Sequence, residues 1–284
     1  VTILTGQGDL GAALSRHPGV DMVTLVGSVP TGKVVMQAAA ETLKPVVLEL
    51  GGKNALIAYP DADPEAVAEA MVDGMNFTWC GQSCGSTSRA FLHADIHDAV
   101  LAHLADKIAR FRPDPPLAED TSMGCLIDAT HHRRVLDYIE TGIEEGARLI
   151  HGGGVPDDDA LSGGCFVDPT VFADVTPDMR IAREEIFGPV LSVLRWTDEP
   201  DMLRDVNALP YGLTCAIWTD SLRTGLRAAG EVRTGYVWIN DVSKHIPGMP
   251  FGGVKQSGIG REESLSELYA FTVEKALHVN FSGT

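Results

Sequence analysis

Short β-rich runs alternate with helix-forming stretches along most of this 284-residue chain, and no other feature of the sequence constrains the fold as strongly. Residues 21–27 (DMVTLVG) form a β-rich apolar run, a turn containing Pro30 and Gly32 follows, and residues 33–42 have helical character. A repeated succession of strand, turn and helix is typical of an α/β protein with a largely parallel sheet.

The succession continues along the chain. Further strands are predicted at residues 46–50, 54–59, 90–93, 166–172, 190–195, 214–218 and 235–240. Further helices are predicted at residues 63–74, 96–111, 130–145, 200–209 and 221–232. Residues 112–120 and 151–164 are predicted to be surface loops, the second of them mobile. The chain starts without a Met, and the apolar residues 1–4 predict a buried strand, which suggests a chain cut from a longer one.

Charge and composition exclude several classes of function. The chain has 22 basic and 39 acidic residues, and its formal net charge of −17 repels the phosphates of nucleic acids and anionic lipids. No stretch approaches the roughly 20 consecutive apolar residues that span a bilayer, and no basic segment followed by an apolar one opens the chain. A hydrophobic content of 44% supplies a core. We therefore expect a globular cytoplasmic protein with neither nucleic acid nor membrane as a partner.

Five scattered cysteines suit neither a disulfide framework nor paired metal ligands. Cys80 and Cys84 stand four positions apart, but no further clustered Cys or His completes a tetrahedral zinc set. We predict reduced thiols and no metal site, with one of these two cysteines as a candidate reactive thiol.

Cys84 ends the segment FTWCGQSC, in a Gly-containing turn before a Ser-rich stretch and a predicted strand. A cysteine is nucleophilic as its thiolate, so it needs a nearby base or dipole to activate it at neutral pH. Taken alone, a cysteine in a turn is more often a small hydrophobic residue.

Glu49 interrupts the apolar strand 46–50 and precedes Gly51 and Gly52. Flanking leucines desolvate a carboxylate and raise its pKa, which suits proton abstraction near neutral pH. The structural alternative is a carboxylate at a strand end that forms a salt bridge with Lys53.

Gly27, Ser28 and Gly32 lie in the turn between the first predicted strand and its helix. Glycines before a helix N-terminus let backbone amides approach a pyrophosphate. The spacing is not the usual G-x-G-x-x-G fingerprint, so an ordinary turn explains it equally well.

These three motifs, in this order, resemble those of the aldehyde dehydrogenase superfamily. The resemblance continues through EEIFGPV at 184–190, GYVWIN at 235–240 and PFGGVKQSG at 250–258. Ordered motifs over almost the whole chain identify it as a member of that superfamily, of the hydrolytic NAD(P)-dependent type.

The resemblance implies a reaction. Cys84 matches the nucleophile that attacks an aldehyde to give a thiohemiacetal, whose oxyanion is held partly by the Cys84 backbone amide. Hydride transfer to the nicotinamide then leaves a thioester. Glu49 matches the base that activates water to hydrolyse this thioester to a carboxylate.

The resemblance also implies binding residues. Glu185 matches the residue that binds the nicotinamide ribose, and Phe187 matches one that packs beside the nicotinamide. The implied coenzyme-binding set is Gly27, Ser28, Gly32, Leu50, Gly51, Glu185 and Phe187, and the implied substrate contacts are Phe77 and Asn240. NAD is the expected cofactor and a small-molecule aldehyde the expected substrate.

Several features depart from the family pattern. The oxyanion-hole asparagine, the lysine at the adenine ribose and the first strands of the dinucleotide fold lie upstream of the position equivalent to Gly27, in a half that this sequence does not contain. NADP is therefore not excluded, because the residue that meets the adenosine 2′ position lies there. Leu265 stands where many members have a proton-relay glutamate, with Glu263 or Glu267 as candidate substitutes.

The expected fold is α/β and aldehyde dehydrogenase-like. Residues 1–51 form the C-terminal part of a Rossmann-like coenzyme domain, residues 52–258 an α/β catalytic domain, and residues 259–284 a returning tail. Residues 276–281 alternate apolar and polar side chains and resemble the family's oligomerisation strand. Because an exposed alternating strand pairs readily with another subunit, we expect a homo-oligomer, a dimer or a tetramer.

Two alternatives to the hydrolytic enzyme stay open. A truncated, non-catalytic remnant would keep Cys84 without holding a dinucleotide. A coenzyme A-acylating semialdehyde dehydrogenase would pass the thioester to a thiol, and the presence of Glu49 argues against it, because that reaction needs no hydrolytic base.

Overall fold

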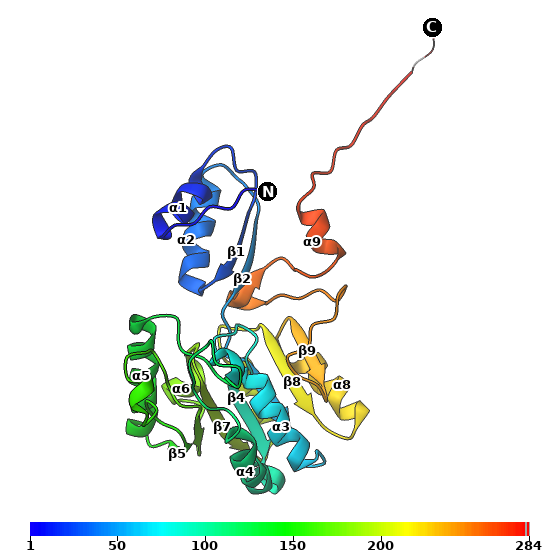
Figure 1. The fold of residues 1–284 in the computed structure, drawn as a ribbon. Helices are drawn as coiled ribbons and strands as arrows, with labels where there is room; N and C mark the ends of the chain where they lie inside the picture. Colours follow the sequence, from blue (N-terminus) through cyan, green and yellow to red (C-terminus); the bar gives the residue numbers. More distant parts are fainter. Residues whose placement is uncertain (282, 284) are drawn as a thin grey trace.

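The structure, a computed structural model, describes residues 1–281 and 283 and has helices and strands along most of the chain (Figure 1). The strands are β1 (Val23–Gly27), β2 (Val46–Leu50), β3 (Ala55–Ala58), β4 (Arg89–His93), β5 (Arg148–His151), β6 (Thr170–Ala173), β7 (Val190–Trp196), β8 (Thr214–Trp218), β9 (Tyr236–Ile239) and β10 (Gly258–Ile259). The α-helices are α1 (Gly8–Arg16), α2 (Val29–Ala40), α3 (Pro64–Met75), α4 (Ala94–Ile108), α5 (Ala129–Glu144), α6 (Arg180–Arg183), α7 (Glu199–Asn207), α8 (Leu222–Glu231) and α9 (Leu265–Ala270). Short 3-10 turns are η1 (Phe77–Trp79), η2 (Asp159–Leu161) and η3 (Lys255–Ser257).

A seven-stranded sheet in the order β5-β6-β7-β4-β3-β8-β9 forms the centre of the larger part of the molecule. All of its neighbouring strands run parallel except β5, which pairs antiparallel with β6 at one edge. The interior strand β3 reads ALIA, and all four of its residues are buried. Such a continuous apolar run is expected of a central parallel strand with both faces covered. Helices α3 and α4 pack on each other and against this sheet, and α7 and α8 also contact it.

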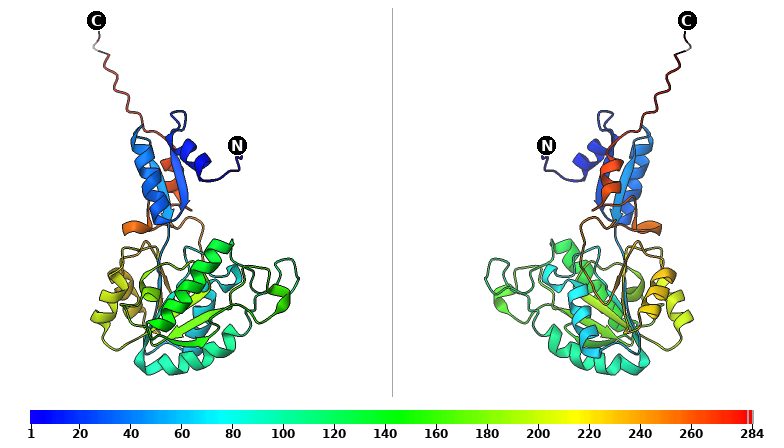
Figure 2. Two further views of the ribbon diagram at one scale, coloured as in Figure 1. Left: turned by 90° about the vertical axis from the view of Figure 1, so that its left-hand side faces the viewer. Right: turned by 90° about the vertical axis from the view of Figure 1, so that its right-hand side faces the viewer.

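A three-stranded sheet, β1-β2-β10, forms a smaller unit beside the larger one (Figures 1 and 2). Strand β2 lies between β1, to which it is parallel, and β10, to which it is antiparallel. Helix α2 packs on β1 and β2, and α1 packs on α2. Strand β2 leads through Gly51 and Gly52 directly into β3, so the end of β2 stands at the junction between the two sheets.

The two units differ in how much apolar surface they bury. One continuous core extends over the seven strands and their helices, whereas the smaller unit has a separate cluster centred on Val35, Leu48 and Leu50. The smaller unit also leaves Val26 and Val34 more than half exposed.

Capping residues explain where several helices begin. Ser28 accepts a hydrogen bond from the Thr31 N–H at the start of α2, and Pro30 stands in the first turn. Asp63 caps α3 in the same way, with Pro64 at its first position. Pro is favoured there because the first N–H groups of a helix have no partner within it. Helix α2 therefore begins at Val29, four residues before the predicted start.

The remaining predicted strands and helices are present with shifts of a few residues at their ends, and residues 112–120 form a loop as predicted. The predicted strand at residues 1–4 is wrong. Val1, Ile3 and Leu4 are exposed, and no strand of the described chain pairs with this segment. Helices α1, α6 and α9 and strands β5 and β10 were not predicted.

Residues 276–281 lie in an extended segment that leads away from the rest of the molecule (Figures 1 and 2). Their apolar side chains Leu277, Val279 and Phe281 are exposed, and no strand is formed there within the single chain. The strand expected at this place requires a partner, so it stays a prediction. None of the helices within residues 1–281 combines the length and the hydrophobicity that a bilayer-spanning helix needs.

Candidate active site

A cavity of about 580 Å³ receives residues from both units. The smaller unit contributes Val26, Gly27 and Ser28, and Gly51 lies at its junction with the larger unit. The larger unit contributes the loop that carries Cys84, helix α5 and the segment before β7. The cavity walls include six residues selected from the sequence: Gly27, Ser28, Gly51, Cys84, Glu185 and Phe187. It therefore brings together segments from five separate parts of the chain.

Polar side chains of the larger unit fix the loop that carries Cys84. The Asn54 Nδ2 donates hydrogen bonds to the Cys84 and Ser86 carbonyls, at 2.7 and 3.0 Å. The Thr214 hydroxyl donates to the Gly85 carbonyl at 3.2 Å. Gly81 has φ +66°, and a Cβ on it would lie 2.2 Å from the Gly188 carbonyl oxygen, so this turn requires glycine. The loop presents a half-buried Cys84 to the cavity.

Opposing effects act on the Cys84 thiol. Burial raises its pKa, and the negative charges of Glu49 and Glu185 raise it further. The backbone N–H groups of Cys84 and Gly85 lower the pKa, because they donate to the sulfur and favour the thiolate. A protonated Glu49 removes one of the two repelling charges, so the states of Cys84 and Glu49 are coupled.

Glu49 lies in β2 and is 2% exposed. Among the described residues neither of its carboxylate oxygens has a hydrogen-bond partner. Burial raises the pKa of Glu49 to about 8, with a further contribution from the charge of Glu262 and an opposing one from Arg261. The salt bridge with Lys53 that was the structural alternative is not formed. A buried carboxylate without a partner has the properties of a general base that works near neutral pH.

Two acidic residues of the tail, Glu262 and Glu263, lie close enough for their charges to raise the pKa of Glu49, and the sequence interpretation named only Glu263 of these two. Residues Phe251 and Glu262 pair across an antiparallel bridge, and a Cβ on the intervening Gly252 would lie 2.6 Å from Glu49 Oε1. Glu262 is also the carboxylate whose charge most raises the pKa of Glu49. Leu265, which stands where many family members have a relay glutamate, is an exposed residue of α9. The tail, which carries Glu262, pairs with the segment PFGG at residues 250–253. This tertiary contact places Glu262 near Glu49.

Glu185 is held against the junction between the two sheets. The Gly52 N–H donates to Glu185 Oε1 at 3.1 Å. A Cβ on Gly51 would lie 1.9 Å from Glu185 Oε2, so only glycine lets the carboxylate approach the backbone this closely. Burial raises the pKa of Glu185, whereas the Gly52 N–H and the positive charges of Lys53 and Arg134 lower it.

Two side chains of α5 that the sequence interpretation missed hold the segment from Glu185 to Phe187. Arg134 donates to the Glu185 carbonyl at 2.8 Å, and His131 Nε2 lies 2.7 Å from the Phe187 carbonyl oxygen. Both residues line the cavity, as do Trp79 and Gln82. His131 and Arg134 stand three positions apart in a predicted helix. This spacing is the only sequence signal that could have paired them.

The other residues selected from the sequence lie outside the cavity wall. A Cβ on Gly32 would lie 2.6 Å from Leu50 Cδ1, so these two residues let α2 approach β2 closely. Phe77 is fully buried, with its ring centroid 5.6 Å from that of Phe111. The Asn240 amide is occupied by two hydrogen bonds with the Thr219 backbone, at 3.0 and 2.9 Å.

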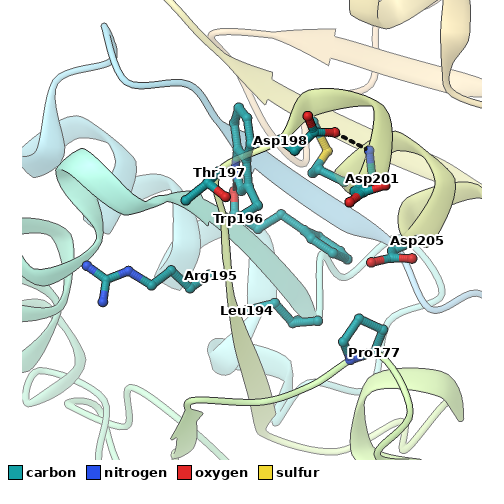
Figure 3. A pocket seen from close by; sticks show the side chains of 10 residues that line it. Pro177, Leu194, Arg195, Trp196, Thr197, Asp198, Asp201 and Asp205 are labelled. Carbon is teal, nitrogen blue, oxygen red and sulfur yellow. Dashed lines mark hydrogen bonds between the residues drawn. The ribbon is translucent and has the colours of Figure 1, made fainter.

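A second cavity, of about 210 Å³, lies where β7 leads into α7 and is lined by Trp196, Asp198, Asp201 and Asp205 (Figure 3). Asp198 caps α7 by accepting from the Asp201 N–H, and both Asp201 and Asp205 pair with Arg204. Its carboxylates thus have structural partners, and the described residues include no group of ligands arranged for a metal ion.

The sequence profile of the aldehyde dehydrogenase family matches residues 1–277. The chain belongs to the aldehyde dehydrogenase family. This confirms the family prediction, and the α/β fold agrees with those of solved aldehyde dehydrogenases. The chain is 53% identical to the aldehyde dehydrogenase tropH of Talaromyces stipitatus, over 100% of this chain and 56% of that protein. It is 43% identical to the betaine aldehyde dehydrogenase of Brucella anthropi, over 98% of this chain and 57% of that protein.

The structure of an aldehyde dehydrogenase from Bacillus cereus in complex with NAD+ superimposes with a TM-score of 0.92 and 39% identity, over 98% of this chain and 56% of that one. The betaine aldehyde dehydrogenase of Staphylococcus aureus, also in complex with NAD+, gives a TM-score of 0.90 at 36% identity, over 94% of this chain and 53% of that one. The chain thus spans a little more than half the length of the aldehyde dehydrogenases it matches.

Proposed function

We propose that this chain carries the thioester-forming and coenzyme-contacting part of an NAD-dependent aldehyde dehydrogenase, which oxidises an aldehyde to a carboxylic acid. One observation carries the proposal: the cavity joins two half-buried side chains, the Cys84 thiol and the Glu185 carboxylate. The buried Glu49 carboxylate, which has no hydrogen-bond partner among the described residues, lies outside the cavity wall but close enough for its charge to raise the pKa of Cys84. Nucleophile, base and coenzyme contact are the three functions that this oxidation requires.

Cys84 forms the first covalent bond. Its sulfur adds to the aldehyde carbon, and the backbone N–H of Cys84 stabilises the negative charge that develops on the aldehyde oxygen. The coenzyme, when bound, supplies a two-electron acceptor for the hydride that leaves the same carbon. Cys84 then holds the acyl group as a thioester.

Glu49 completes the reaction by hydrolysis. Its carboxylate takes a proton from a water molecule as the water attacks the thioester, and the Cys84 thiol is released with the carboxylate product. A pKa of about 8 makes Glu49 a stronger base than an exposed glutamate, at the cost of a smaller ionised fraction at neutral pH. Glu262 is the neighbouring carboxylate through which the proton is passed to solvent.

The coenzyme contacts proposed for this chain fit the cavity. Ser28 caps α2, so the N-terminus of that helix faces the side of the cavity formed by Gly27 and Ser28, which suits a pyrophosphate. The close approach of Gly51 to Glu185 leaves the carboxylate at the cavity wall, where it can accept hydrogen bonds from ribose hydroxyl groups. NAD is the proposed coenzyme, in line with the NAD+ complexes of the similar Bacillus and Staphylococcus enzymes.

A coenzyme A-acylating enzyme is the weaker alternative, because the buried Glu49 has no hydrogen-bond partner in the part of the chain that the structure describes, and hydrolysis gives it a role. A non-catalytic remnant that binds no dinucleotide is the other alternative, and the experiment below distinguishes it. The proposed division into residues 1–51, 52–258 and 259–284 is supported by the two separate sheets, with the exception that β10, at the 258/259 boundary, pairs with β2 of the first unit.

We also propose that residues 276–281 pair with a second copy of the chain. The support is the extended path of this segment and its alternating exposed apolar side chains, such as Leu277 and Val279. Substituting both residues with Asp should shift the mass measured by light scattering towards a monomer, whereas an unchanged mass would contradict the pairing.

The deciding experiment is NADH formation with a panel of small aldehydes, for this chain and its Cys84→Ala variant, together with a fluorescence measurement of NADH binding. NADH formation that depends on Cys84 supports the enzyme. NADH formation that needs added coenzyme A favours the acylating alternative. Absence of both NADH binding and turnover contradicts the proposal and favours the remnant.

A further inference from the structure

Lys53 follows the Gly51–Gly52 junction and has a buried charge that the proposed mechanism does not use. Its side chain is 1% exposed. Within residues 1–281 and 283 its Nζ has no hydrogen-bond partner, and no carboxylate lies within ion-pair distance of it. A buried ammonium without a partner is costly, so its retention at this place calls for an explanation.

Arg89, a second fully buried cation, fixes the backbone of Lys53 but does not neutralise its charge. The Arg89 Nε donates to the Lys53 carbonyl at 2.9 Å, and its guanidinium also donates to the Val206 carbonyl at 3.2 Å. Burial and the positive charge of Arg89 lower the pKa of Lys53 to about 7. The charges that favour the ammonium are those of Glu185 first and Glu184 second.

Glu185 carries the opposite charge to Lys53 and also has few partners for that charge. Its carboxylate is largely withdrawn from water, and it forms no salt bridge within the described residues. The Gly52 N–H is its one backbone donor, and Lys53 and Arg134 are the two cations whose charges favour its ionised form. Arg134 extends from α5 and is used by the Glu185 carbonyl, whereas Lys53 continues from the same junction that touches the carboxylate.

We propose that Lys53 is a positioning residue, whose buried ammonium is the counter-charge that keeps the Glu185 carboxylate ionised and turned towards the cavity as an acceptor for the hydroxyl groups of a ribose. A carboxylate accepts hydrogen bonds at both oxygens only when ionised. The inference deepens the proposed function and rests on the coenzyme role given there to Glu185.

The coupling between the two charges is reciprocal, which provides a test without coenzyme or turnover. Replacing Lys53 with Met should raise the pKa of Glu185, and replacing Glu185 with Gln should lower the pKa of Lys53 by the same amount. An opposite charge at this range shifts a pKa by roughly one unit or more. Carbon-13 NMR of labelled Glu and Lys side chains in the full chain measures both shifts.

Lys44→Met is the matched control. Lys44 is also buried, and its Nζ donates to the His17 carbonyl at 2.7 Å, away from Glu185. This variant removes a buried lysine from the smaller unit and should leave the Glu185 titration unchanged. Lys53→Arg, if it folds with the wild-type melting temperature, should restore most of the shift. Equal Glu185 titration curves in wild type and folded Lys53→Met would overturn the proposal.

NADH binding provides the second measurement. Lys53→Met should weaken binding about 10-fold at about pH 6.5, since Glu185 is then more protonated, and the loss should disappear above about pH 8, where Lys53 is neutral in the wild type too. The same substitution in a Glu185→Gln background should cause no further loss. A loss that is equal at every pH, or that persists in that background, would contradict the positioning role. If wild type binds no NADH, the proposed function fails, while the NMR titration still decides the coupling.

Discussion

The two sheets contribute to one cavity in different ways. The seven-stranded sheet and its helices bury a continuous core, and side chains from that core, Asn54 and Thr214, fix the loop of Cys84. The three-stranded unit has a far smaller core, yet its strand β2 carries Glu49 and ends at the Gly51 turn. The proposed nucleophile is therefore positioned by packing, whereas the proposed base and the proposed coenzyme contact are positioned at a junction.

The two regions should therefore respond differently to substitutions. A substitution in the seven-stranded sheet acts on the loop of Cys84 through many fixed contacts. It should therefore either leave the reaction rate almost unchanged or abolish the reaction. A change at the junction should alter a pKa, a distance or a coenzyme affinity while the fold persists. The predictions below test this division.

The largest effect is expected for Cys84→Ala, on the side of the large sheet. With an activated ester such as p-nitrophenyl acetate, acylation needs only the thiol, and the variant should lose about 10⁴-fold or more in rate. Release of p-nitrophenolate measures it. Cys80→Ala, a buried cysteine four residues away, should stay within about 10-fold of wild type. Similar losses in both variants would mean that the loop, and not the Cys84 thiol, carries the reaction.

On the junction side, Glu49→Gln should leave acylation of Cys84 largely intact and slow hydrolysis of the thioester by about 10² to 10⁴-fold. An initial burst of p-nitrophenolate should then be followed by almost no turnover, and mass spectrometry should find the acyl group on Cys84. If hydrolysis proceeds at the wild-type rate, the smaller unit contributes no base.

Gly51→Ala should weaken NADH binding by about 10 to 100-fold and lower the unfolding free energy by about 1–3 kcal/mol, since the added methyl displaces the Glu185 carboxylate. Fluorescence titration and urea unfolding measure the two effects. Gly27→Ala provides the contrast, because its Cβ would meet nothing closer than Leu25 Cδ1 at 3.5 Å. Its stability should be close to that of wild type. If both variants lowered the unfolding free energy equally, the close approach of Gly51 to Glu185 would not be the cause of the loss.

The smallest expected effect is on pH dependence. Glu49 must be ionised to act as a base, and its pKa of about 8 means that the hydrolysis rate should rise about 10-fold per pH unit below that value and level off above it. In Glu49→Gln this rise should be absent. Because the folded pKa is raised above that of the unfolded chain, ionisation of Glu49 also costs stability as the pH rises from about 4.5 to 8. The Gln variant should therefore gain in melting temperature relative to wild type only across that window and above it.

Most elements of the fold could be predicted from the sequence, because caps, prolines and apolar runs are local signals. The fully apolar β3 and the capped α3 are examples. Residues 1–4 misled the prediction because an apolar run indicates a strand only when another strand pairs with it. Residues 276–281 likewise form a strand only when another strand pairs with them.

The site was predictable where chemistry and sequence motif coincide, as at Cys84 and Gly51, which line the same cavity. It was not predictable where tertiary contacts decide. Glu262 reaches Glu49 through the pairing of the tail with Phe251, and Phe77 turns into the core against Phe111. Neither arrangement has a signal in residue spacing.

The most direct test of the account is to incubate the Glu49→Gln variant with an aldehyde and NAD+ and to locate any acyl group by peptide mass spectrometry. The account predicts an acyl adduct on Cys84 that forms only when aldehyde and NAD+ are both present, because oxidation precedes the blocked hydrolysis. No adduct, an adduct on another cysteine, or an adduct formed without NAD+ would contradict it.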